Sequence, residues 1–470
     1  MTAADLSRVE TSELVGTGER RLSRALVLTI AFGAVLQALN ASTMAVALVD
    51  IRDQFDAGAA ASWMISGLYL ATAVGSPTAG RLADLFGSRR VFLASLALTL
   101  VASAAAPLAP NLGWLIAFRV LLGIGTCAAF PAGVAMLRAE ADRLGVELPT
   151  AALSVLAIGG QVMVAFGPVV GGVLVQYWGW RSIFLMNLPL AAVVIVMALV
   201  WLPRDRGVDK RASVWGRLDL VGAGLFAATV AVLMLFLLSL SERPQWWWLP
   251  VLAVVAAAFV AFELRAREPF VDVRMLAGNR ALSGTYLRTA LTYVAFYMVF
   301  FGFPMWLQSA RGLPPGQVGL VVLPIALLAM ASVAVAGRVL PRMGHWPVLV
   351  AGSAMLLAGG VGLILLDATA VVGALVAVAA VLGVPNGFNN IGNQSALYRQ
   401  AAARDAGIAA GLFRTSQYVG ANIAAAMIEL CFAGPVSDPG LHRLGGVVAG
   451  ISAVLLVGAL VGLVVGRRFR

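Results

Sequence analysis

Long apolar segments constrain this chain more than any other feature. Fourteen stretches of about 20 mostly apolar residues follow one another, each long enough to cross a bilayer core as a helix. Hydrophobic residues make up 61% of the 470 residues and charged residues 12%, which is more apolar surface than a soluble domain of this size could bury. The sequence therefore predicts an all-α membrane protein with fourteen transmembrane helices, centred near residues 37, 70, 100, 125, 163, 191, 229, 255, 295, 327, 354, 382, 418 and 454.

The basic residues divide unequally between the two predicted faces of the membrane. Five of the 33 lie on one face, three lie inside predicted spans, and the other 25 lie on the opposite face. Because Lys and Arg are retained in cytoplasmic loops, both termini are expected in the cytoplasm, as tails over 1–21 and 467–470. The net charge of +11 then reflects membrane orientation, and no nucleic-acid partner is expected.

An internal repeat divides the chain into two related parts. "AGRLADLFGSRRVFL" begins at Ala79, and "AGRVLPRMGHWPVLV" begins 257 residues later at Ala336. Both copies follow a second predicted span on the cytoplasmic side. Since secondary transporters are commonly built from such repeats, we expect six-helix bundles over 22–202 and 281–466. The linker 203–280 would then carry two inserted transmembrane helices.

Several motifs resemble those of the major facilitator superfamily, in the same order and over nearly the whole chain. "GRLADLFGSRR" resembles its cytoplasmic signature, "RVLLGIG" its fourth-helix motif, and "GPVVGG" the fifth-helix motif of its exporters. "WGWRSIFLMNLP" and "FELRAREPFVDVRML" are similar to the 14-helix drug:proton antiporter branch. The resemblance implies the major facilitator fold, transport by alternating access, and no cofactor.

The signature loop is the first candidate site. The resemblance implies a conformational latch on the cytoplasmic side, formed by Gly80, Asp84, Gly87, Arg89 and Arg90. A carboxylate is favourable beside guanidinium groups and at a helix N-terminus. The alternative is a tight solvated turn whose arginines follow from topology alone.

The "GPVVGG" motif is the second candidate. Gly167, Pro168, Gly171 and Gly172 would let one helix bend and approach a neighbour closely, as small residues do in membranes. We expect a hinge at the interface between the two halves. Ordinary helix packing is the alternative.

The stretch "PNGFNNIGNQ" predicts a polar stripe inside a membrane helix. At 100° per residue its amide side chains fall within an arc of about 140°, a sorting that a loop does not require. Polar side chains in a membrane face a bundle interior or water, so we expect them to line a central cavity, with interhelical hydrogen bonding as the alternative. The predicted cavity comprises Gln37, Asn40, Arg119, Tyr293, Tyr297, Asn386, Asn389, Asn390, Asn393, Gln394, Arg414, Gln417 and Tyr418.

Proton coupling is less clear from the sequence. The antiporter branch commonly carries an aspartate where this chain has Asn40, and an amide does not titrate near neutral pH. No carboxylate or imidazole lies in the middle of a predicted span. The candidates for coupling are Glu429, Asp50 and the motif residue Arg119, and a carrier without proton coupling is the alternative.

These features predict a secondary-active exporter of amphipathic small molecules in a bacterial cytoplasmic membrane, working as a monomer. A lipid or anionic-metabolite carrier on the same fold is the alternative. We do not expect an enzyme, because Cys127 and Cys431 are isolated, no metal-ligand spacing occurs, and no ATP-binding GxxxxGK[ST] loop is present.

Overall fold

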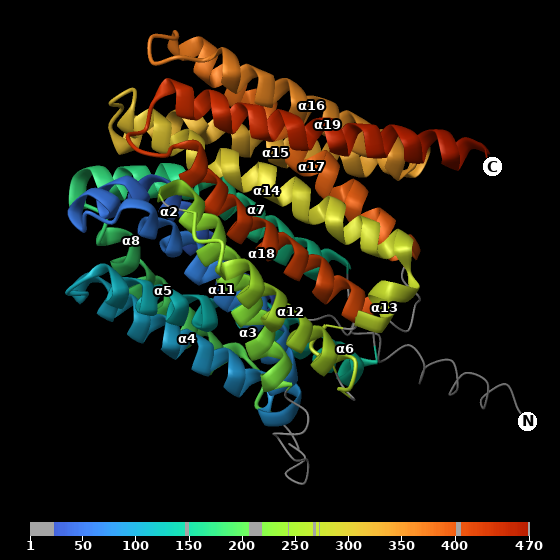
Figure 1. Cartoon of the computed structure of the whole chain (residues 1–470). Coiled ribbons are helices and arrows are strands. Elements are labelled where there is room, and N and C mark those ends of the chain that lie inside the picture. The colour runs from blue at the N-terminus through green and yellow to red at the C-terminus, as the bar shows by residue number, and fades with distance from the viewer. Residues whose placement is uncertain are drawn as a thin grey trace, which may run out of the picture.

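The protein is entirely helical in the residues that the computed structural model describes, which are 23–145, 150–205, 219–242, 244–266, 269–271, 273–400 and 406–468. The predicted all-α fold is confirmed (Figure 1). The α-helices are α2 Arg24–Gln54, α3 Trp63–Phe86, α4 Ser88–Ala105, α5 Leu112–Cys127, α6 Ala129–Leu144, α7 Thr150–Trp178, α8 Ser182–Leu185, α9 Asn187–Trp201, α11 Leu220–Glu242, α12 Trp248–Glu263, α13 Val273–Gly278, α14 Arg280–Ser309, α15 Pro315–Met343, α16 His345–Leu365, α17 Val372–Gln400, α18 Ala406–Cys431 and α19 Asp438–Arg468.

Ten of the helical segments in the described part are long and apolar enough to cross a membrane. They contain the predicted span centres other than those near 70, 163, 255 and 418. Those four centres fall within α3, α7, α12 and α18, of which α12 is a shorter apolar helix. The chain is therefore a multi-pass membrane protein. The predicted N-terminal tail, residues 469–470 of the predicted C-terminal tail and part of the linker 203–280 lie outside the described residues.

The helices pack in the same pairs before and after the linker. The helix α2 packs on α7, α3 on α5, and α4 on α9. In the later part α14 packs on α18, α15 on α17, and α16 on α19. If α5 and α6 are counted as one segment, Leu112–Leu144, and the four-residue α8 is left out, these are in both parts the first and fifth, second and fourth, and third and sixth helices. Most of the yellow-to-red helices lie above the blue ones in Figure 1.

Two glycines mark the repeat in the backbone. Gly87 separates α3 from α4 with φ +96°, and Gly344 separates α15 from α16 with φ +80°. This left-handed region favours glycine because it has no Cβ. The two positions are 257 residues apart, so both copies of the repeated motif turn the chain in the same way.

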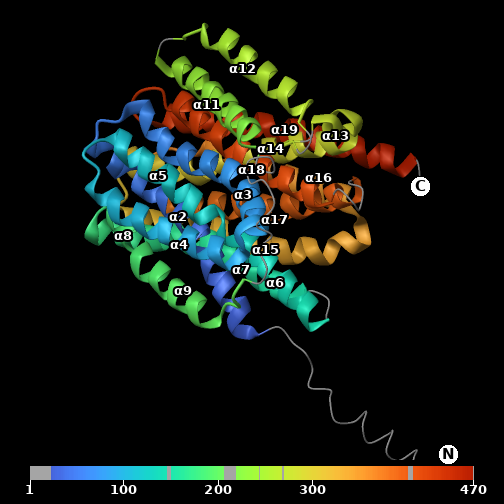
Figure 2. The ribbon, with the colours of Figure 1, turned by 90° about the horizontal axis from the view of Figure 1, so that it is seen from below.

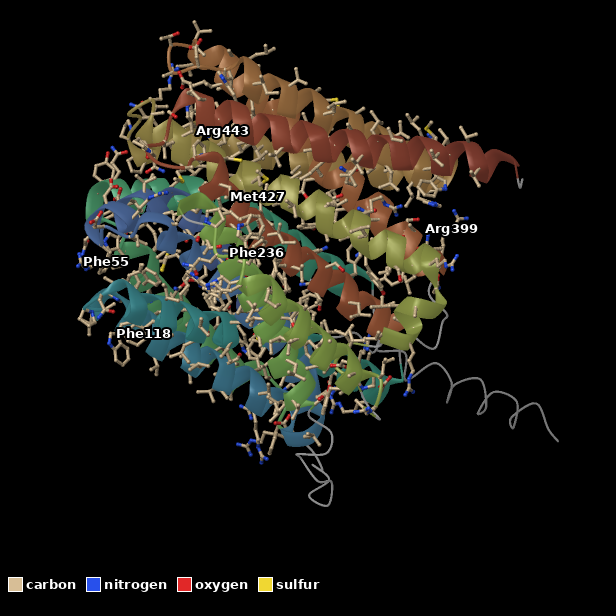
Figure 3. The ribbon with its side chains drawn as sticks, viewed as in Figure 1. Phe55, Phe118, Phe236, Arg399, Met427 and Arg443 are labelled. Atoms are coloured by element: carbon tan, nitrogen blue, oxygen red, sulfur yellow. The ribbon has the colours of Figure 1, made fainter. Side chains whose placement is uncertain are left out.

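The most extensive contacts between the two parts run through three helix pairs. The helix α7 packs on α15, α3 packs on α18, and α2 packs on α14. Figure 3 shows Arg443 and Arg399 at opposite ends of the molecule, and we use these residues to name its Arg443 end and its Arg399 end. The ends of α3, α9, α15 and α17 lie at the Arg399 end together with the starts of α4, α14 and α16.

The inserted helices α11 and α12 lie at the margin of the bundle, with α12 outermost (Figure 2). The helix α11 packs on α18 and α3. Two carboxylates bind the segment between α12 and α13 to the start of α11 and the end of α12. Asp219 accepts from the backbone N–H of Phe270 at 2.9 Å, and Glu263 accepts from that of Val271 at 3.2 Å. Glu263 is buried.

Candidate functional site

Aromatic side chains from both parts of the chain meet at the centre of the molecule. Tyr69 of α3 lies with its ring centroid 4.8 Å from that of Tyr297 and 6.5 Å from that of Phe301, both on α14. It stacks on Tyr418 of α18 at 6.0 Å. Tyr293 is 5.8 Å from Tyr297. We call these five residues the aromatic cluster.

The aromatic cluster contains three predicted cavity residues, namely Tyr293, Tyr297 and Tyr418. Sequence reasoning missed Tyr69, because it is the only tyrosine on its helix and forms no stripe with another. A polar contact also crosses between the two parts here, since Gln37 Nε2 of α2 donates to the Tyr418 hydroxyl at 3.4 Å. Gln417 is half-buried.

Arg414 makes a second contact between the parts. It is exposed, and its guanidinium carbon lies 4.4 Å from the ring centroid of Phe130 on α6. It lies one turn before Tyr418 on α18. A cation held over an aromatic face is a favourable arrangement, and this one places a positive charge beside the aromatic cluster.

Arg119 and Asn40 lie inside the first bundle rather than between the two parts. Arg119 is 1% exposed and donates to the backbone carbonyls of Met64 at 3.0 Å and Asn40 at 2.8 Å. Asn40 and Asn187 exchange two side-chain hydrogen bonds of 3.0 and 2.8 Å, and Asn187 also donates to Ser103 at 3.1 Å. Asn40 is therefore bound to α9, a partner that local spacing could not reveal.

The amide stripe is helical, as predicted, because α17 runs unbroken from Val372 to Gln400. Its members face different surroundings. Asn386 lines a pocket described below, whereas Asn389 and Asn393 are each 1% exposed. Asn389 lies against Gly352 of α16, and Asn393 accepts from Nε of Arg288 on α14. Asn390 is half-buried and Gln394 exposed.

A pocket opens beside the aromatic cluster, between α7, α14, α15 and α17. A second hollow adjoins it. Both are lined by Phe296, Phe300, Ile325 and Asn386. Three helices of the second part, α14, α15 and α17, thus bring together one predicted cavity residue and three apolar side chains.

The signature loop is held by a residue that the sequence did not single out. Asp205, after α9, accepts from the backbone N–H groups of Arg89 and Arg90, both at 3.0 Å. Arg89 Nη2 also donates to the carbonyl of Leu199 at 2.8 Å. A carboxylate at this position satisfies free N–H groups of the first turn of α4. The signal in the sequence was an acid directly after a predicted span.

Other parts of the predicted latch remain predictions. The side chain of Asp84 lies outside the described part of the structure. A Cβ on Gly87 would overlap the Asp205 carboxylate, whereas a Cβ on Gly80 would meet no atom within 4 Å. Arg81, which follows Gly80, donates to the carbonyl of Pro269 in the linker at 3.2 Å.

The "GPVVGG" motif sits where α7 is pressed between two helices. A Cβ on Gly167 would overlap Ser42 of α2, and a Cβ on Gly172 would overlap the carbonyl of Pro315 on α15. Gly171 faces Thr43 of α2. Pro168 lies inside the helix without ending it. Gly167 and Gly171 therefore serve close packing within the first part, and Gly172 serves close packing across the interface between the parts, whereas the hinge role of the motif stays a prediction.

An ion pair joins the two parts near the Arg443 end. Arg52 of α2 contacts Glu429 of α18 through two nitrogen–oxygen distances of 3.3 and 3.1 Å. The Glu429 side chain is 4% exposed and that of Arg52 is 19% exposed. Asp50, two residues before Arg52, is half-buried. Glu429 was a candidate from the sequence, but its partner was not.

Comparison with known proteins places the chain in a family. Residues 30–425 match the model of the Major Facilitator Superfamily. YwoD of Bacillus subtilis, an uncharacterized MFS-type transporter, is 32% identical over 92% of this chain and 96% of its own length. The tetracenomycin C resistance and export protein of Streptomyces glaucescens is 30% identical over 88% of this chain and 76% of its own. The lincomycin resistance protein of Streptomyces lincolnensis is 34% identical over 72% and 70%.

The fold has a solved counterpart as well. The crystal structure of a point mutant of the nucleoside transporter NupG superimposes with a TM-score of 0.67, covering 93% of this chain and 99% of that chain at 14% identity. At that identity the similarity concerns the fold alone. The resemblance drawn from the sequence motifs is confirmed, and the chain belongs to the Major Facilitator Superfamily as a multi-pass bacterial membrane transporter related to drug-efflux proteins.

Proposed function

We propose that this transporter exports amphipathic small molecules from the bacterial cytoplasm by alternating access and draws its energy from the proton gradient. Fourteen spans would form six-helix halves over 22–202 and 281–466, with the inserted pair within 203–280 and both termini in the cytoplasm. The repeated pairing of helices and the matching turns at Gly87 and Gly344 support this division.

The observation that carries the proposal is the aromatic cluster shared between the two halves. Tyr69 belongs to the first half, whereas Tyr297, Phe301 and Tyr418 belong to the second. Rings with hydroxyl groups offer apolar faces and adaptable hydrogen bonds, which suit bulky amphipathic ligands. Because the halves meet at this cluster, a rocking motion would separate its members and expose a bound molecule to one side at a time.

The proposed coupling site is the pair of Arg52 and Glu429. A buried carboxylate is stable as an ion only while its partner compensates its charge. Protonation of Glu429 would neutralise the carboxylate and end its attraction to Arg52. Glu429 would take up a proton from outside while the Arg443 end is open, could then be buried again as a neutral acid, and would lose the proton toward the cytoplasm after that end has closed. Proton movement and the alternation of the halves would thus be linked through one ion pair.

The alternative is a carrier for lipids or anionic metabolites. Arg414 favours it, because this exposed guanidinium lies over Phe130 and one helical turn from Tyr418 of the aromatic cluster. Arg119 favours it too, since this buried cation donates to backbone carbonyls. An anionic group on the cargo would be attracted to both charges.

Ethidium accumulation in a drug-hypersensitive bacterial host tests the proposal. Cells that produce the transporter should hold less ethidium at steady state than cells with an empty vector. Tyr297→Ala should abolish the difference, because it removes the central ring of the cluster. Tyr398→Ala is the matched control, since Tyr398 is 55% exposed on α17. Equal accumulation in all four strains would contradict export of this dye class.

A further inference from the structure

The pocket beside the aromatic cluster begins where the close contact between α7 and α15 ends. The helices α7 and α15 run close together at Gly172 and at Gly319, where an added Cβ would meet the backbone of Pro315 and of Pro168. One turn further toward the Arg399 end, larger side chains separate them: Val164 on α7, and Val322 and Ile325 on α15. The pocket therefore begins where the glycine-mediated contact ends.

The helix α17 closes the pocket on another side. A Cβ on Gly383 would overlap the carbonyl of Ile325, and a Cβ on Gly387 would overlap Ser332 of α15. These two glycines press α17 against α15, and Asn386 between them lines the hollow. Close backbone packing on two sides fixes the walls, so the size of the pocket depends on a few side chains.

The lining is chemically simple. The pocket is bounded by Val164, Pro168, Phe296, Phe300, Val322, Ile325, Ala326, Ala329 and Asn386. Asn386 is the only polar side chain among these described residues, and none of them is charged. The adjoining hollow adds one hydroxyl, that of Thr292. Such a lining favours apolar groups and disfavours charged ones, which would lose their hydration without a partner.

The pocket is continuous with the aromatic cluster through Phe296. Its ring centroid lies 5.1 Å from that of Tyr297, 6.0 Å from that of Tyr293 and 5.5 Å from that of Phe300. One face of α14 thus carries the hydroxylated rings and the next carries the purely apolar ones. A molecule bound at the cluster would have an uncharged apolar chamber within reach of one ring.

We infer that the pocket is a tail subsite: it takes an unbranched alkyl chain of a substrate whose aromatic, polar head binds the aromatic cluster, and Ala329 sets the tail length that fits. The inference rests on the proposed export of amphipathic molecules and adds the class of amphipath. Ala329 is 7% exposed and lines the chamber with a single methyl group. A larger side chain there would fill space that the tail needs.

Alkyl-triphenylphosphonium cations test the inference, because they join an aromatic head to a tail of chosen length. The butyl and decyl members would be titrated against the purified full-length protein in detergent, with binding followed by quenching of tryptophan fluorescence. Ala329→Phe should reduce the preference for decyl over butyl by about tenfold, the effect of excluding roughly two methylenes from an apolar site. Ala331→Phe, at an exposed position on the same helix, should leave that preference unchanged.

A second variant protects the test against a misfolded Ala329→Phe protein. Val164→Ala enlarges the chamber from the α7 side, so it should retain binding and shift the preferred tail to a longer member of the series. An unchanged tail preference in Val164→Ala and Ala329→Phe, with normal affinity for the butyl compound, would overturn the tail subsite. Failure of the wild-type protein to bind any member would instead contradict the proposed function.

A membrane lipid is the other source of an alkyl chain. If Ala329→Phe reduces the phospholipid that copurifies with the protein and leaves the decyl-to-butyl preference unchanged, the chamber holds a lipid chain and the substrate assignment is wrong. If the preference falls and the bound phospholipid is unchanged, the substrate assignment stands.

Discussion

Breaking the ion pair between Arg52 and Glu429 should open the Arg443 end of the transporter. In Arg52→Gln the Glu429 carboxylate, which is 4% exposed, would remain buried without a compensating charge. Loss of one partner of a buried pair costs about 3–5 kcal/mol. Because Arg52 is itself 19% exposed, we expect a smaller penalty, roughly 2–3 kcal/mol.

The transporter can avoid this penalty without unfolding, because separating α2 from α18 would let water reach the carboxylate. The lost free energy would therefore raise the ratio of open to closed molecules by a factor of roughly thirty or more. Arg52→Lys keeps the charge and should shift the ratio much less. Glu429→Gln leaves no buried ion on α18 and should have an intermediate effect.

Spin labels report this shift directly. Cysteines would replace Asp53 and Ala433, which are exposed at the Arg443 end on opposite sides of the interface, after Cys127 and Cys431 are changed to alanine. Double electron–electron resonance should show a longer distance becoming dominant in Arg52→Gln. A distance distribution identical to that of the parent protein would refute the idea that the Arg52–Glu429 ion pair holds the two halves together at the Arg443 end.

Three further substitutions test the interfaces around the site. Gly172→Leu should abolish dye export with normal membrane insertion, because its side chain would collide with Pro315 on α15; Gly337→Leu, where a Cβ meets no atom within 4 Å, should retain export. Asn187→Leu should destabilise the purified protein by about 1–3 kcal/mol in an SDS-unfolding titration, since it leaves buried polar groups unpaired; an unchanged midpoint would contradict this. Asp205→Asn should cost about 1 kcal/mol at the start of α4, seen as faster amide exchange there, and unchanged exchange would show that the cap contributes little.

The family and the helical fold could be predicted because they depend on local pattern. Apolar length identifies a membrane helix whatever it packs against, and the motif from Gly80 to Arg90 can be read in one short segment. The repeat was visible for the same reason. Gly87 and Gly344 each have a positive φ, which favours glycine. This preference is local to the turn and does not depend on distant residues.

The contacts within the site could not be predicted in the same way, because each joins distant segments. Arg52 meets Glu429 across 377 positions of the chain, and Asn40 meets Asn187 across 147. Helical periodicity groups residues on one face, but it does not say which neighbour that face meets. Asn386 and Asn389 show this limit, since they lie on one stripe and yet face a pocket and a glycine of α16.

Transport by the purified protein in liposomes tests the central claim most directly. Ethidium uptake would be followed with a pH gradient at zero membrane potential, and separately with a potential at equal pH on both sides. The account predicts that the pH gradient alone drives accumulation, and that Glu429→Gln abolishes accumulation while downhill exchange of dye continues. Accumulation that follows the potential alone, or is unchanged in Glu429→Gln, would contradict proton-coupled export through this ion pair.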